Sequence, residues 1–93
     1  MSKMSANSIV RKIDDVNCGK IDDEGIILNL SNGDYFRVNS TSLFIWNALS
    51  GHRSLAEIAK KVASHFNVNM ETALEDVLDF VKELNELKLV RAI

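Results

Sequence analysis

The chain has 93 residues, 46% of them hydrophobic and 26% charged, and this composition is typical of one globular domain. Its formal net charge of −2 lacks the basic surplus that nucleic-acid-binding domains usually carry. The single cysteine excludes an internal disulfide framework, and no apolar run reaches the ~20 residues that span a bilayer. We therefore expect a cytoplasmic protein that binds a partner at its surface, with neither nucleic acid nor a membrane as that partner.

The N-terminal part of the chain predicts a flexible start, a strand and a turn. Residues 1–8 are small and polar without periodicity, so we expect a flexible N-terminus followed by a single domain over residues 9–93. Residues 9–20 are expected to hold a lead-in segment and then an edge strand that ends near Ile21. An acidic turn over residues 22–25 follows.

The dipeptide Asn32-Gly33 is the strongest local signal, because it tolerates the positive φ angles of a type I′ hairpin turn. The β-rich apolar run Ile26–Leu30 before it is a predicted strand. Tyr35–Val38 after it is the predicted returning strand. These residues together predict a β-hairpin.

A two-residue loop places Leu30 opposite Tyr35 and makes both faces of this hairpin largely apolar. One face holds Ile26, Leu28, Leu30, Tyr35 and Arg37, and the other holds Ile27, Asn29, Phe36 and Val38. An antiparallel sheet with one face in water usually has a polar face. Either other elements cover both faces, or part of one face stays open for a ligand.

The next two helices are predicted by their capping residues. Asn39 or Ser40 caps a first helix that is apolar nearly all round and ends before Gly51. Ser54 and Glu57 form the capping box of a second helix with regular helical spacing.

A third helix is predicted from Met70 to about Leu87, with Asn69 as its cap. Its apolar residues fill roughly half of the helical circumference. The centre of this arc is predicted core and consists of Val77, Val81 and Leu84. Two edges flank it, Leu74 with Leu78 on one side and Phe80 with Leu87 on the other, and the sequence leaves open which edge borders a groove. The remaining face is acidic, which repels phosphates and attracts a basic peptide.

Four segments in this order resemble one family: "IILNLSNGDYFRVN", "STSLFIWNALSGHRS", "SLAEIAKKVASHFNV" and "ALEDVLDFVKELNELKLV". From about Val16 to Val90 the chain is similar to the PqqD-like family, the RiPP precursor peptide recognition elements. Lys88 stands where many relatives carry glycine.

The resemblance implies an α+β fold, a small winged-helix domain with a three-stranded antiparallel sheet followed by three helices. It implies a non-catalytic adaptor, without cofactor or metal, that binds the leader segment of a ribosomally made precursor peptide by strand addition. The adaptor presents the peptide to a modifying enzyme, such as a radical SAM protein of PQQ biosynthesis or a lasso-type protease and cyclase. By position, the peptide-binding residues are Asp34, Tyr35, Phe36, Arg37 and Val38 of the third strand, and Leu74, Val77, Leu78 and Val81 of the third helix.

Two other functions compete with this interpretation. A winged-helix DNA-binding regulator has the same parts, but its groove-reading helix is the acidic one here. An enzyme needs Cys18, His52 or His65 as nucleophile or base, and no metal-binding or phosphate-binding motif accompanies them.

The sequence assigns two aromatic side chains to the core and leaves two roles open for Arg37. Phe44 and Trp46 are predicted core residues, since they lie in the apolar first helix. Arg37 either pairs with an acidic leader residue or lies over Tyr35.

Overall fold

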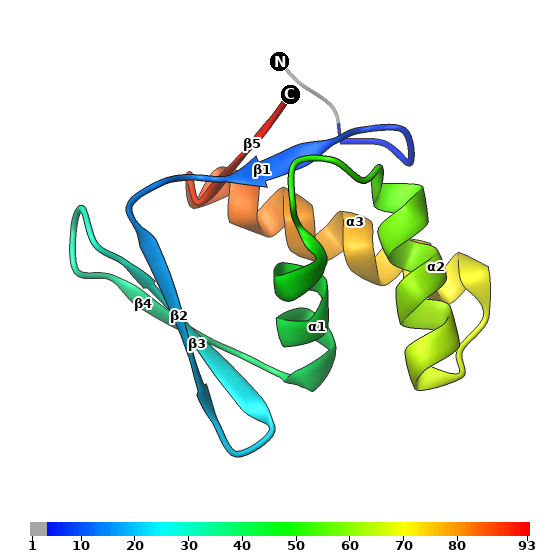
Figure 1. Ribbon diagram of the computed structural model, residues 1–93, viewed down its shortest axis with the longest axis horizontal. Helices are drawn as coiled ribbons and strands as arrows, with labels where there is room; N and C mark the ends of the chain where they lie inside the picture. Colours follow the sequence, from blue (N-terminus) through cyan, green and yellow to red (C-terminus); the bar gives the residue numbers. More distant parts are fainter. Residues whose placement is uncertain (1–3) are drawn as a thin grey trace.

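The computed structural model describes residues 4–93 and has an antiparallel sheet followed by three helices (Figure 1). The sheet has the order β2-β3-β4, with β3 in the centre. Its strands are β2 (Val16–Ile21), β3 (Glu24–Asn29) and β4 (Tyr35–Val38). The helices are α1 (Ser40–Ala48), α2 (Leu55–Phe66) and α3 (Met70–Glu86). The predicted α+β arrangement is confirmed.

A second, two-stranded sheet joins the two ends of the domain. Strand β1 (Val10–Lys12) pairs antiparallel with β5 (Val90–Ala92). The lead-in segment and the last residues of the chain, where the sequence allows either a short strand or an extended tail at Leu89 and Val90, are therefore paired strands. The sequence pattern does not show that these two segments pair.

The segment before β1 contacts the start of α2. The amide of Leu55 donates to the carbonyl of Ser8 at 2.9 Å, and that of Ala56 donates to Ala6 at 2.9 Å. The predicted flexible N-terminus covers residues 1–8, of which residues 1–3 lie outside the described part. The boundary between this segment and the domain stays a prediction.

The predicted two-residue loop of the β3–β4 hairpin is wrong. Leu28 lies opposite Tyr35, so the loop spans residues 30–33. A type I′ turn needs positive φ at both central residues, and Asn32 is not among the positive-φ residues of the described chain, whereas Gly33 is at +80°. The register shifts by two residues, so the predicted sorting of side chains by face is preserved.

Asn29 explains this longer loop. Its carbonyl accepts from the amide of Gly33 at 2.8 Å, and its side-chain Oδ1 accepts from the amide of Ser31 at 2.9 Å. The amide of Leu30 donates to the carbonyl of Asp15 at 2.9 Å, which ties the loop to the segment before β2. These bonds satisfy loop groups that a tighter turn leaves unpaired.

The predicted helix caps are confirmed. Asn39 Oδ1 accepts from the amide of Ser42 at 2.8 Å, and Asn69 Oδ1 accepts from Thr72 at 2.7 Å. Ser54 forms the predicted capping box at the start of α2. The three helices therefore begin where the sequence places them.

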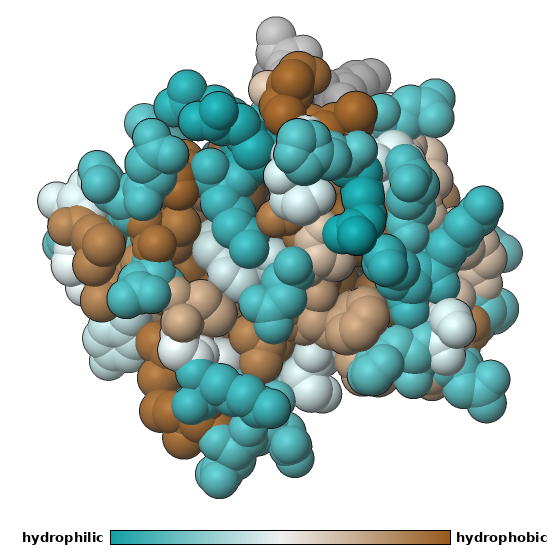
Figure 2. All heavy atoms as spheres, in the orientation of Figure 1, coloured by the Kyte–Doolittle hydropathy of each residue, from teal (hydrophilic) through white to brown (hydrophobic). Residues whose placement is uncertain are grey.

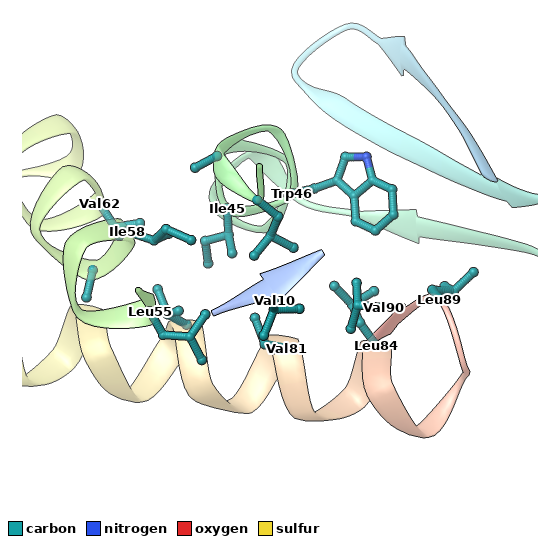
Figure 3. Packing of buried hydrophobic residues seen from close by; sticks show 14 of the residues in the cluster. Val10, Ile45, Trp46, Leu55, Ile58, Val62, Val81, Leu84, Leu89 and Val90 are labelled. Atoms are coloured by element: carbon teal, nitrogen blue, oxygen red, sulfur yellow. The ribbon is translucent and has the colours of Figure 1, made fainter. Parts of the chain in front are cut away.

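The main core lies between the helices and the β1–β5 sheet (Figure 3). Trp46 is 2% exposed, as predicted, and extends from α1 on the side of the β2–β3 hairpin. Phe44 is only half-buried and stacks on the ring of His65 with centroids 4.5 Å apart. It therefore lies at the edge of the core.

The β2-β3-β4 sheet has one covered face and one open face. Ile27, Phe36 and Val38 belong to the covered face and pack on the core. The opposite face, called the outer face below, consists of Asn17, Gly19, Ile21, Glu24, Ile26, Leu28, Tyr35 and Arg37. Figure 2 shows hydrophobic atoms at the surface on this sheet side of the molecule. Of the two alternatives left open by the sequence, full cover of both faces is wrong.

Candidate peptide-binding groove

Strand β4 offers an open edge for another strand. β3 pairs with β2 on one side and β4 on the other, so the far side of β4 is the rim of the sheet. Asn29 donates its amide to the carbonyl of Asp34 at 2.8 Å. Since backbone groups alternate in direction along an antiparallel strand, Phe36 and Val38 bond β3. The backbone N–H and C=O groups of Tyr35 and Arg37 point to the open edge.

A groove of about 430 Å³ lies beside this edge. One wall is β4 and the other is the C-terminal half of α3. Its lining residues are Ile27, Tyr35, Phe36, Arg37, Val38, Asn39, Ser42, Phe80, Glu83, Leu84 and Leu87. The groove therefore combines an edge strand, an apolar floor and a charged rim.

The structure brings four of the five predicted strand residues to this groove. Tyr35, Phe36, Arg37 and Val38 all line it. Tyr35 is 67% exposed, whereas Phe36 and Val38 are half-buried and face the core side. Asp34 is exposed just before β4 and does not line the groove.

The predicted helix residues lie elsewhere. Val77 and Val81 are both 0% exposed and belong to the core. Leu74 and Leu78 are half-buried on the opposite edge of α3 and do not line the groove. None of these four side chains lines the groove beside β4, and their contact with a leader stays a prediction.

The groove is bordered by the Phe80–Leu87 edge of α3. Phe80 is half-buried, Leu87 is 37% exposed, and Leu84 between them is 2% exposed. Glu83 lies on the rim. The sequence indicated that either edge of the apolar arc could border the groove. Tertiary packing decides which edge does so, because it sets how α3 is oriented against the sheet.

Arg37 pairs with Glu24 rather than lying over Tyr35, and its pairing with an acidic leader residue stays a prediction. Its Nη2 lies 3.1 Å from Oε2 of Glu24, on the outer face of the same sheet. Both side chains are more than half exposed, so this ion pair adds little stability. Arg37 can therefore exchange Glu24 for another carboxylate at little energetic cost.

A second hollow of about 300 Å³ continues the groove past the end of β4. It shares Asn39, Ser42, Phe80 and Glu83 with the groove. Asp76 and Asp79 of α3 also line it, so its helix wall is acidic.

The residues considered for catalysis do not meet. Cys18 is half-buried on β2, whereas His52 and His65 are exposed in the turn after α1 and on α2. Burial raises the pKa of the Cys18 thiol, and the Lys12 ammonium lowers it by less.

No cluster of three metal-ligating side chains occurs among residues 4–93. In the same range, no helix has the length and apolar character needed to cross a membrane.

Sequence comparison decides the family. The family model described as coenzyme PQQ synthesis protein D (PqqD) matches residues 24–90. The chain belongs to the PqqD family. This match covers all three helices and both strands of the β3–β4 hairpin.

Two solved structures share the fold of this PqqD-family chain. One is TbiB1 in complex with the TbiA(beta) leader peptide, with 28% identity and a TM-score of 0.77 over 87% of this chain and 94% of that one. The other is a lasso peptide synthetase B1 complexed with the leader peptide, with 23% identity and a TM-score of 0.78 over 89% and 98%. A search of curated proteins by sequence finds no match.

The alternative of a DNA-binding regulator is not supported. The match to the PqqD family model argues against it. The exposed face of α3 carries Glu71, Glu75, Asp76, Asp79, Glu83 and Glu86 against Lys82. Carboxylates on the groove-reading helix repel the phosphate backbone.

Proposed function

We propose that this PqqD-family chain binds the leader segment of a ribosomally synthesised precursor peptide and presents the peptide to a modifying enzyme. The observation that carries the proposal is the open edge of β4 beside the groove. The family and the likeness to TbiB1, whose structure holds a leader peptide, support it.

The leader adds to the sheet as a fourth strand next to β4. The outward backbone groups of Tyr35 and Arg37 pair with the leader backbone and supply affinity that is independent of leader sequence. Side chains directly opposite each other share a face of a sheet. The leader residue opposite Phe36 therefore enters the groove, and those opposite Tyr35 and Arg37 lie on the outer face.

Selectivity comes from the groove. We propose that Phe80, Leu84 and Leu87 contact the leader, in place of Leu74, Val77, Leu78 and Val81. Leu84 and Ile27 are nearly fully buried and form the floor, so the groove selects an apolar leader side chain. Asp34 offers its side chain at the end of the paired region.

The chain acts in this proposal without catalysis and without a cofactor. Its raised thiol pKa makes Cys18 a weak nucleophile, and the two histidines lie apart from it at the surface. The enzyme that receives the peptide is a radical SAM protein or a lasso-type protease and cyclase. We place this step in the cytoplasm, where precursor peptides are synthesised.

A binding titration tests the proposal. A fluorescein-labelled leader peptide from a precursor gene beside this one is titrated with the chain and followed by fluorescence anisotropy. We expect a dissociation constant in the micromolar range or below. A shuffled peptide of equal composition and a DNA duplex serve as controls. Equal affinity for leader and shuffled peptide rejects the proposal.

A further inference from the structure

The outer face of the β2-β3-β4 sheet exposes an apolar patch that nothing in residues 4–93 covers. Ile21 is 54% exposed and Tyr35 is 67% exposed. Leu30, in the adjoining loop, is 56% exposed. Ile26 and Leu28 between them are half-buried. A sheet face that serves only to meet water is normally polar, so this patch indicates a contact surface.

Gly19 in the middle of β2 has no explanation inside the chain. The glycines with positive φ are Gly33 and Gly51, so Gly19 is not required by backbone conformation. A Cβ atom at Gly19 meets nothing within 4 Å, whereas one at Gly25 lies 2.7 Å from Leu43 Cδ1. Glycine weakens a strand interior and often marks a close approach from outside.

The missing side chain leaves a hollow of about 320 Å³ on the outer face. Asn17, Ile21, Ile26 and Leu28 line it together with the strand backbone around Gly19. A hollow with apolar walls and a glycine floor fits a bulky apolar side chain of another protein.

The outer face is continuous with the leader-binding edge. Tyr35 and Arg37 present their side chains on this face and their backbone groups to the open edge. A leader strand on β4 therefore widens the outer face from three strands to four. A protein docked on this face contacts the adaptor and the leader at once.

The size of the face favours a partner that also holds the leader. From strand spacing and rise, three strands of this length offer roughly 300 Å². A stable pair of proteins needs about 800 Å² from each. Any partner that contacts this face alone, a second copy included, falls short of that area, whereas an enzyme that also holds the leader gains the missing contact.

We propose that the outer face is the docking surface for the enzyme that processes the precursor peptide, with a bulky apolar side chain of that enzyme in the hollow at Gly19. The inference rests on the proposed function, because an adaptor needs one surface for the leader and a second for the enzyme. The leader then lies along the β4 edge, and the enzyme covers the outer face and the part of the leader strand that extends it.

The test begins with photo-crosslinking. p-Benzoylphenylalanine replaces Asn17, at the rim of the hollow, in cells that express the chain with its neighbouring genes. We expect a crosslink to an enzyme that acts on the precursor peptide, identified by mass spectrometry. A crosslink only to a second copy of the chain, to a protein that does not act on the peptide, or to nothing overturns the proposal.

The variant Gly19→Val then separates docking from leader binding. A Cβ atom at position 19 meets nothing within 4 Å and valine favours a strand, so the variant is expected to fold, with a Tm equal to or above that of the parent. We expect unchanged leader affinity and a more than tenfold loss of precursor processing by the crosslinked enzyme. Arg91→Val, at an exposed position of β5, is the matched control and should process normally.

The outcomes distinguish the two proposals. Full processing with Gly19→Val overturns the docking surface and leaves leader binding intact. Failure of the unmodified chain to bind the leader peptide overturns the proposed function and, with it, this inference.

Discussion

Phe36 of β4 and Phe80 of α3 line the same groove from opposite walls, although 44 positions separate them in the chain. Both side chains are half-buried and pack against the core on one side. The groove is therefore held open by residues that the core fixes in place. In the proposed binding mode the leader meets a preformed site, which lowers the entropic cost of binding.

Replacing one of these two rings tests the helix wall of the groove. We expect Phe80→Ala to weaken leader binding about tenfold or more, or about 1.4 kcal/mol, because an apolar contact in the groove is lost. Fluorescence anisotropy with the labelled leader measures the change, and circular dichroism checks the fold.

Leu74→Ala is the matched control, since Leu74 is also half-buried but lies on the other edge of α3. Its leader affinity should stay within about twofold of the parent. A larger loss with Leu74→Ala than with Phe80→Ala would return the site to the edge expected from the family.

The groove shows what sequence can and cannot predict here. The resemblance placed the leader on Asp34–Val38, and the structure puts β4 (Tyr35–Val38) at an open edge. The helix positions depend on how α3 is rotated against the sheet. A helix with apolar residues over half its circumference fits several rotations, so Phe80 and Leu74 are equivalent until the packing is known.

The predicted register of the β3–β4 hairpin is wrong for a different reason. Asn-Gly is a general preference, and it was overridden by specific bonds of Asn29 and Asp15 to loop amides. The β1–β5 pair was not predicted because it joins segments at opposite ends of the sequence, and a local pattern does not encode such a contact. By contrast, the caps at Asn39, Ser54 and Asn69 depend on local chemistry, and all were predicted.

We predict that replacing Lys88 by glycine stabilises the fold. It has a φ of +61° after the end of α3, a conformation that favours glycine. We expect Lys88→Gly to raise the free energy of unfolding by about 1 kcal/mol and Tm by about 4–8 °C. Thermal unfolding followed by circular dichroism measures this.

Lys82→Gly is the control for that substitution. Lys82 is exposed in the interior of α3, where glycine costs about 1 kcal/mol relative to a good helix former. Equal destabilisation by both glycines would show that the positive φ at Lys88 carries no strain.

We predict that the Cys18 thiol of the native protein reacts slowly with alkylating reagents. Burial raises its pKa, with the opposing effect of Lys12 smaller, so the fraction of thiolate at pH 7.5 is lower than in the unfolded chain. We expect iodoacetamide to alkylate the native protein several-fold more slowly than the chain in urea. Because its pKa is raised, the native thiol should need a higher pH than the unfolded chain for the alkylation rate to rise. Rapid alkylation at pH 7 would indicate an activated thiol and reopen a catalytic role.

The central claim is that the leader becomes the next strand beside β4, and amide hydrogen exchange measured by NMR tests it most directly. In the free protein, the outward amides of Tyr35 and Arg37 should exchange faster than those of Phe36 and Val38, which bond β3. Saturating leader peptide should slow exchange at Tyr35 and Arg37 more than tenfold and change Phe36 and Val38 little. Unchanged exchange at Tyr35 and Arg37 in the saturated complex would contradict strand addition at this edge.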